Sequence, residues 1–129
     1  MNKVLVSPAI IPPTSYYSHA QEVPQGSRIL FASGQIPVTP EGTCPADFAS
    51  QARQCWRNLA AVLSAANMEM KDLVRVQAFV TRVEDLEAYR EIRNEIVESL
   101  RPAHTLLVVA RLGKPEWLVE IEGIAAKAP

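Results

Sequence analysis

Two amphipathic helix patterns with a strand pattern between them constrain the fold of this chain most strongly. Apolar side chains recur every three or four residues from 48 to 66, and again from Leu86 to Leu100. Between these stripes, residues 72–81 carry valine or alanine at every second position, which is the period of a strand with one buried face. Two helices that flank such a strand favour a sheet with both helices packed on one side.

Three further segments have the β-branched and aliphatic character of strands. They are residues 28–34 before the first helix, and 104–111 and 117–126 after the second. We expect the last two to form a hairpin through a turn near Gly113. The predicted fold class is therefore α+β, with one mixed sheet and two helices on one face.

Composition narrows the class of protein. A chain of 129 residues with 48% hydrophobic content predicts a single domain, 1–129. Thirteen basic and fourteen acidic residues, without basic runs, indicate no partner among nucleic acids or anionic membranes. The apolar N-terminus is interrupted by prolines, which argues against a signal peptide or membrane span and predicts a cytoplasmic protein.

The cysteines and histidines are too few and too scattered for a metal site. Cys44 and Cys55 form no CxxC pair, and the only histidines are His19 and His104. We expect no structural zinc and no disulfide, with both cysteines as free thiols in a reducing compartment.

Two carboxylates stand out on the last predicted strand. Glu120 and Glu122 are two residues apart, so both point to the same face. One interpretation is a solvent-facing acidic edge. The other is a crevice in which burial raises the pKa of one carboxyl and allows general acid/base catalysis. The strand pattern alone is compatible with both.

Other candidate residues lie at strand and loop ends. His104 opens a predicted strand, either as a packed imidazole or as a group that faces an anionic ligand. Tyr16 and Tyr17 are an apolar plug or ligand contacts, and Gly34, after Ser33, permits close backbone approach.

The face of the sheet opposite the helices is predicted to be apolar. Phe79, Leu107 and Val109 fall on this face by alternation. Apolar patches of this kind usually mark an interface. We therefore expect oligomerisation through the open face.

Five segments together resemble one known family. "SYYSHAQ", "LFASGQIPVTPEG", "QARQCWRNLAAVLSAANMEMKDLVRVQAFVT", "RPAHTLLVVARLG" and "VEIEGIAA" occur in the order seen in the reactive intermediate deaminase superfamily, also called YjgF-like or endoribonuclease L-PSP-like proteins. The resemblance runs from about residue 8 to the C-terminus. It implies a chorismate-mutase-like fold and a homotrimer whose sheets form a central barrel, with ligand pockets in the clefts between subunits.

The resemblance also implies a chemistry. Family members hydrolyse enamines and imines to a 2-keto acid and ammonia, without metal or organic cofactor. By matching position, Tyr17 lines the pocket, Gly34 brings its backbone close to the ligand, and Glu120 positions or activates the attacking water.

Three positions depart from the family pattern. His104 stands where active deaminases have the arginine that grips the substrate carboxylate, Arg90 where many members have asparagine, and Leu106 where cysteine is common. Imidazole supplies one donor and no permanent charge, so it does not replace a guanidinium fork. We expect His104, with Arg90 as a second candidate, to meet an anionic ligand, and binding to strengthen as the pH falls through about 6.5.

Three functions therefore stay open. The chain is a deaminase-like hydrolase with a non-archetypal substrate, or a trimer that binds a metabolite without catalysis, or a ribonuclease as the family's older label suggests. The absence of basic runs disfavours the third.

Overall fold

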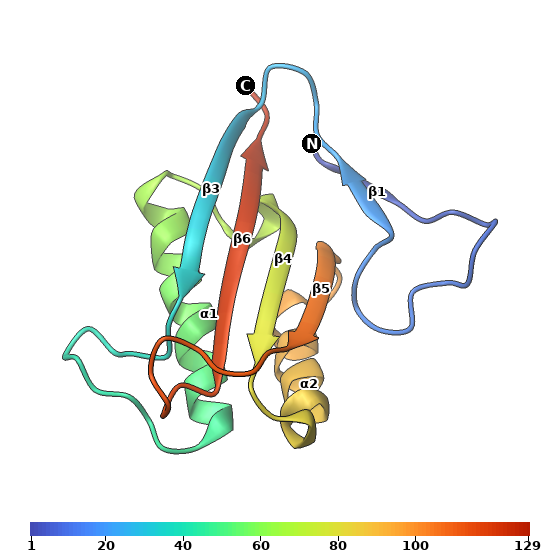
Figure 1. Ribbon diagram of the computed structural model, residues 1–129. Helices are drawn as coiled ribbons and strands as arrows, with labels where there is room; N and C mark the ends of the chain where they lie inside the picture. The colour runs from blue at the N-terminus through green and yellow to red at the C-terminus, as the bar shows by residue number, and fades with distance from the viewer.

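The computed structural model describes all 129 residues and places two helices behind a four-stranded sheet (Figure 1). The elements in chain order are β1 (Lys3–Leu5), β2 (Ala20–Glu22), β3 (Arg28–Gln35), α1 (Phe48–Ala65), η1 (Met70–Asp72), β4 (Leu73–Val80), η2 (Val83–Asp85), α2 (Leu86–Val97), β5 (Ala103–Val108) and β6 (Val119–Lys127). This arrangement confirms the α+β class, the mixed sheet and the helices on one face.

The order of the strands differs from the predicted hairpin. The sheet runs β3-β6-β4-β5, so β6 pairs with β3 and β4 and makes no ladder with β5. The crossover through α2 sets β5 parallel to β4 at the edge of the sheet. The strand β6, whose alternate residues are buried, takes the central position, where both of its edges are hydrogen-bonded. The hairpin prediction was wrong because the short connection between β5 and β6 was taken to mean that these two strands pair directly.

Helix α1 begins and packs as its sequence predicts. The Oδ2 atom of Asp47 accepts a hydrogen bond of 2.9 Å from the backbone N–H of Ser50, which caps the first turn. The apolar stripe of α1, including Cys55 and Leu59, is buried in a core of 18 residues. Cys44 and Cys55 are both free thiols.

Helix α2 ends earlier than predicted. It stops at Val97 rather than reaching Leu100, and Glu98 has a φ of 46°. A residue that precedes a proline avoids the right-handed helical region, and Arg101 before Pro102 has a φ of 49°. The helix therefore ends at Glu98, whose positive φ does not continue a right-handed helix, and Pro102 follows four residues later.

The open face of the sheet is apolar in part. Leu107 is 42% exposed there, whereas Phe79 and Val109 are half-buried. Phe31 of β3, which the sequence reading did not assign to this face, is 75% exposed. Carboxylates and an arginine share the face, so it is not a uniform apolar patch.

The N-terminal residues form an arm beside β5. Strands β1 and β2 make their own two-stranded sheet, set to one side of the main sheet (Figure 1). A bridge between Ser18 and Ala103 ties the arm to the start of β5. This contact brings Tyr17 near the entrance of β5. Neither α1 nor α2 combines the length and the hydropathy that a membrane-spanning helix requires.

Candidate functional site

A small cavity lies where the N-terminal arm, α2 and the outer edge of β5 meet. It has a volume of about 180 Å³ and is lined by Thr14, Ser15, Tyr17, Arg90, Arg93, His104 and Leu106. Three of the predicted site residues, Tyr17, Arg90 and His104, are therefore brought together by the fold, although they lie far apart in the sequence.

His104 is held by a buried tyrosine. Its Nε2 atom lies 2.8 Å from the Oη atom of Tyr89 on α2. Burial, and then the positive charges of Arg93 and Arg75, lower the pKa of His104 to about 3. The imidazole is therefore neutral at physiological pH, which argues against the expected strengthening of ligand binding by its protonation near pH 6.5. His104 offers a hydrogen-bonding group to the cavity and no charge.

Arg93 supplies a buried charge that sequence reading missed. Only 3% of the residue is exposed, and its Nε and Nη2 atoms donate to the Oδ1 atom of Asn94 at 3.2 and 3.1 Å. Nη2 also donates to the Oγ atom of Ser15. The four ion pairs of the structure do not include Arg93. The signal in the sequence was its position four residues after Tyr89, on the buried side of α2.

Arg90 lies at the rim of the same cavity. Its side chain is 43% exposed, and Nη1 lies 3.5 Å from the Oε2 atom of Glu87 one turn earlier. An exposed pair of this kind contributes little to stability and leaves the guanidinium mobile. Arg90 is thus less fixed than Arg93.

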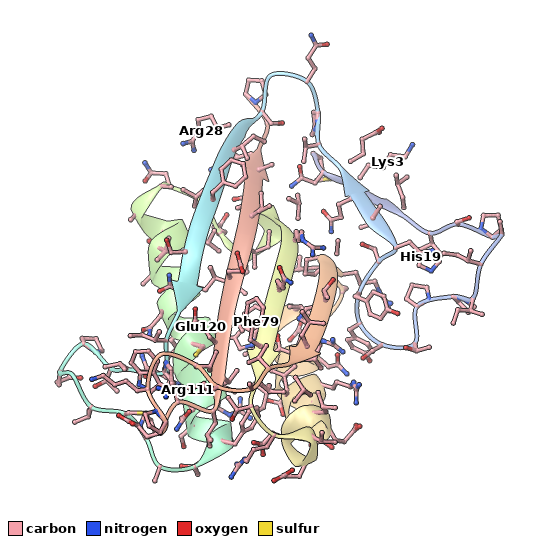
Figure 2. The ribbon with its side chains drawn as sticks, viewed as in Figure 1. Lys3, His19, Arg28, Phe79, Arg111 and Glu120 are labelled. Carbon is pink, nitrogen blue, oxygen red and sulfur yellow. The ribbon has the colours of Figure 1, made fainter.

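Glu120 and Gly34 make a second cluster, on the open face. Figure 2 shows Glu120 next to Phe79, its Cα partner on β4. A Cβ atom on Gly34 would lie 2.0 Å from the Oε2 atom of Glu120, so any other residue here would require this carboxylate to move. Burial, and then the charge of Glu122, raise the pKa of Glu120. Ser33 lies beside this cluster and is exposed.

The two clusters face opposite sides of the sheet. His104 pairs with Val76, which is buried under the helices, whereas Glu120 pairs with Phe79, three residues further along β4. Because side chains alternate along a strand, Val76 and Phe79 point to opposite faces. One chain therefore does not bring His104 and Glu120 into one site.

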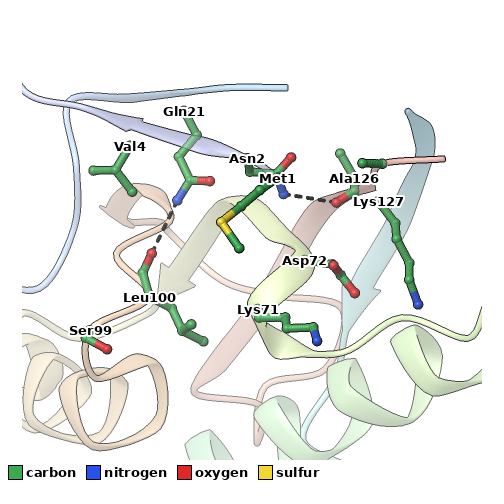
Figure 3. A pocket seen from close by; sticks show the side chains of 11 residues that line it. Met1, Asn2, Val4, Gln21, Lys71, Asp72, Ser99, Leu100, Ala126 and Lys127 are labelled. Carbon is green, nitrogen blue, oxygen red and sulfur yellow. Dashed lines mark hydrogen bonds between the residues drawn. The ribbon is translucent and has the colours of Figure 1, made fainter. Parts of the chain in front are cut away.

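The largest cavity lies elsewhere and contains none of the predicted residues. It has a volume of about 390 Å³, between the N-terminal segment, η1 and the end of β6 (Figure 3). Its polar side chains are mostly bonded within the chain: Asn2 donates to the carbonyl of Ala126 at 2.9 Å, and Lys71 pairs with Glu69 at 2.9 Å. These groups do not converge on a ligand. No cluster of three metal-ligating side chains is present anywhere in the chain.

The fold and the two clusters define an α+β domain with a candidate small-molecule site, and comparison with known proteins identifies the family. The sequence model of the Endoribonuclease L-PSP family matches residues 8–127. The chain belongs to this family, the reactive intermediate deaminase or YjgF-like superfamily.

Individual relatives agree with this assignment. The chain is 37% identical over 123 residues to the 2-iminobutanoate/2-iminopropanoate deaminase of Escherichia coli, covering 89% of this chain and 91% of the relative. It is 35% identical over 114 residues to the putative reactive intermediate deaminase TdcF of the same species, covering 85% and 87%.

Solved structures show the same fold. The Rid-family protein YyfB of Yersinia pestis superimposes with a TM-score of 0.86 at 28% identity, covering 98% of each chain. The structure of E. coli TdcF with bound serine superimposes with a TM-score of 0.74 at 31% identity, covering 98% of this chain and 93% of that one.

Proposed function

We propose that this chain is a cofactor-free hydrolase that converts a small, anionic enamine or imine to a keto compound and ammonia. The observation that carries the proposal is the Glu120 carboxylate, which lies against Gly34 with a raised pKa and without a hydrogen-bond partner in the chain. A carboxyl group whose pKa is raised by burial is suited to proton transfer. The names of the deaminase relatives support the same reaction class.

The reaction needs few protein groups. An iminium carbon is already electrophilic, so a positioned water attacks it while Glu120 accepts one proton from that water. The new C–O bond gives a tetrahedral aminoalcohol. Glu120 then returns the proton to the nitrogen, the C–N bond breaks, and ammonia leaves with the electron pair of that bond. A second proton is lost from the hydroxyl, which leaves the keto compound.

We further propose that the complete site forms between copies of the chain in a homotrimer. Since His104 and Glu120 face opposite sides of one sheet, they meet only if the β5 edge of one copy approaches the open face of another. The exposed apolar side chains of Phe31 and Leu107 on that face support such a contact.

The expected oligomer has a mass near three times 14.2 kDa by light scattering at micromolar concentration. Phe31→Asp should shift the population to smaller species, because it places a charge on the proposed contact. Phe31 is a suitable position because its exposure makes a folding defect in the single chain small. A stable monomer of the unaltered protein would rule out the shared site.

The function itself is tested by ammonia release from imines generated freshly in the assay. We expect release above the spontaneous rate for small imines that carry a carboxylate, and little for neutral imines of the same size. One observation favours a second candidate, a trimer that binds metabolites without catalysis: the position of the family's carboxylate-binding arginine holds a neutral, half-buried imidazole. Tight binding of 2-keto acids with only the spontaneous rate of release would establish that alternative.

A further inference from the structure

We infer that Arg93 is the residue that binds the carboxylate of the ligand, in the cavity beside His104. The inference rests on the proposed small-molecule site and names the group that recognises its substrate class. The family motifs assign no role to an arginine at this position of α2, so the assignment comes from the geometry of this chain.

The first argument is that Arg93 carries a buried charge without an acidic partner. Removing a guanidinium from water is costly unless a counter-charge or a full set of acceptors replaces the water. Here the only acceptors are two neutral oxygens, on Ser15 and Asn94. The cost is understandable if an anion completes the site when the ligand binds.

The second argument concerns the part of the guanidinium that stays free. Nε and Nη2 donate to Asn94 and Ser15, and Nη1 makes no hydrogen bond within the chain. Only three side-chain polar atoms are fully enclosed without a hydrogen-bond partner, Asn2 Oδ1, Ser18 Oγ and Trp56 Nε1, and Arg93 Nη1 is not among them. Nη1 is therefore not fully enclosed and has two N–H groups to donate, and because Arg93 lines the cavity, we place these N–H groups toward the ligand.

The third argument is the charge of the cavity as a whole. Its lining contains Arg90 and Arg93 and no acidic residue, with hydroxyls from Thr14, Ser15 and Tyr17. His104 is neutral, so the positive charge comes from the arginines. A cavity of about 180 Å³ with this lining suits a small carboxylate, whose two oxygens match guanidinium N–H groups.

Arg93 is the better anchor of the two arginines. Ser15 and Asn94 hold its plane in one orientation before the ligand arrives, so little side-chain entropy is lost on binding. Arg90 is partly exposed and shared with Glu87. We therefore assign the specific contact to Arg93 and only long-range attraction to Arg90.

The test is calorimetric titration of the full-length protein with 2-oxobutanoate and with its neutral amide. We expect the unaltered protein to prefer the acid, and Arg93→Met to weaken binding of the acid by about 10- to 100-fold while leaving the amide nearly unchanged. Arg90→Met is the matched control, with an expected loss of roughly threefold or less that disappears at high salt. A merely structural role would weaken both ligands equally.

These outcomes separate the inference from the proposed function, because the ligands do not react. If Arg93→Met keeps the preference for the acid, or if the unaltered protein shows none, the inference is overturned whatever the activity. If the unaltered protein binds the acid but releases no ammonia, and Arg93→Met loses the acid binding, the inference stands and the proposed hydrolysis fails. Should Arg93→Met not fold, Arg93→Lys decides: it keeps the charge without the fork, and acid binding as tight as in the unaltered protein would contradict the assignment.

Discussion

Replacing Glu120 with glutamine is expected to lower the turnover of imines by about 100-fold or more, the scale of lost general acid/base catalysis. Glutamine has nearly the same shape and fits against Gly34, so the fold and the oligomer should be unchanged. The measurement is kcat and KM for ammonia release, with circular dichroism and light scattering on the same preparation. The loss should fall mainly on kcat, because Glu120 acts on the water.

Two further variants sharpen this prediction. Glu122→Gln removes the like charge that helps raise the pKa of Glu120, so the acidic limb of the pH–rate profile should move to lower pH with kcat largely retained. Gly34→Ala places a Cβ where the Glu120 carboxylate lies and should reduce turnover by displacing it. Undiminished turnover in Glu120→Gln would mean that this carboxylate is only structural.

Acid should destabilise the protein well above the pH at which carboxylates titrate, because of His104. Its pKa is about 3 in the folded chain and 6.5 as the reference value, so below pH 6.5 the unfolded chain binds a proton that the folded chain does not. The free energy of unfolding should therefore fall by roughly 1.6 kcal/mol per chain between pH 6.5 and pH 5. Urea denaturation at fixed protein concentration measures this loss.

The matched variants are His104→Gln and His19→Gln. Glutamine at 104 keeps an acceptor for the Tyr89 hydroxyl but takes up no proton, so the loss between pH 6.5 and 5 should largely vanish. Replacing His19, the only other histidine, should leave the loss of stability between pH 6.5 and 5 unchanged. An equal acid loss in His104→Gln would show that other groups cause it. Because His104 stays neutral in the folded chain, it should not make the affinity for keto acids change between pH 8 and 5.5.

Local features of the fold could be predicted because their causes are local. The apolar stripe of α1 and the alternation along β4 depend on residues close to each other in the sequence. The position of β6 between β3 and β4 could not be read in this way. Which strands pair depends on burial summed over the whole sheet and on where the α2 crossover places β5.

The candidate site shows the same division. Its residue types were recognisable in the sequence: Tyr17, Gly34, Arg90, His104 and Glu120 were all named from motifs. The division of these residues between two faces could not be recognised in the sequence. It follows from the strand register, which pairs His104 with a buried valine and Glu120 with Phe79.

By itself, the sequence determined the fold class and the family and named candidate site residues, since periodicity and motifs are encoded over short distances. Only the tertiary structure decided their electrostatic state. The burial of His104 against Tyr89 makes the imidazole neutral, and the packing of the N-terminal arm over α2 encloses Arg93 without an acidic partner. Desolvation depends on everything that surrounds a group, and those surroundings come from segments far apart in the chain.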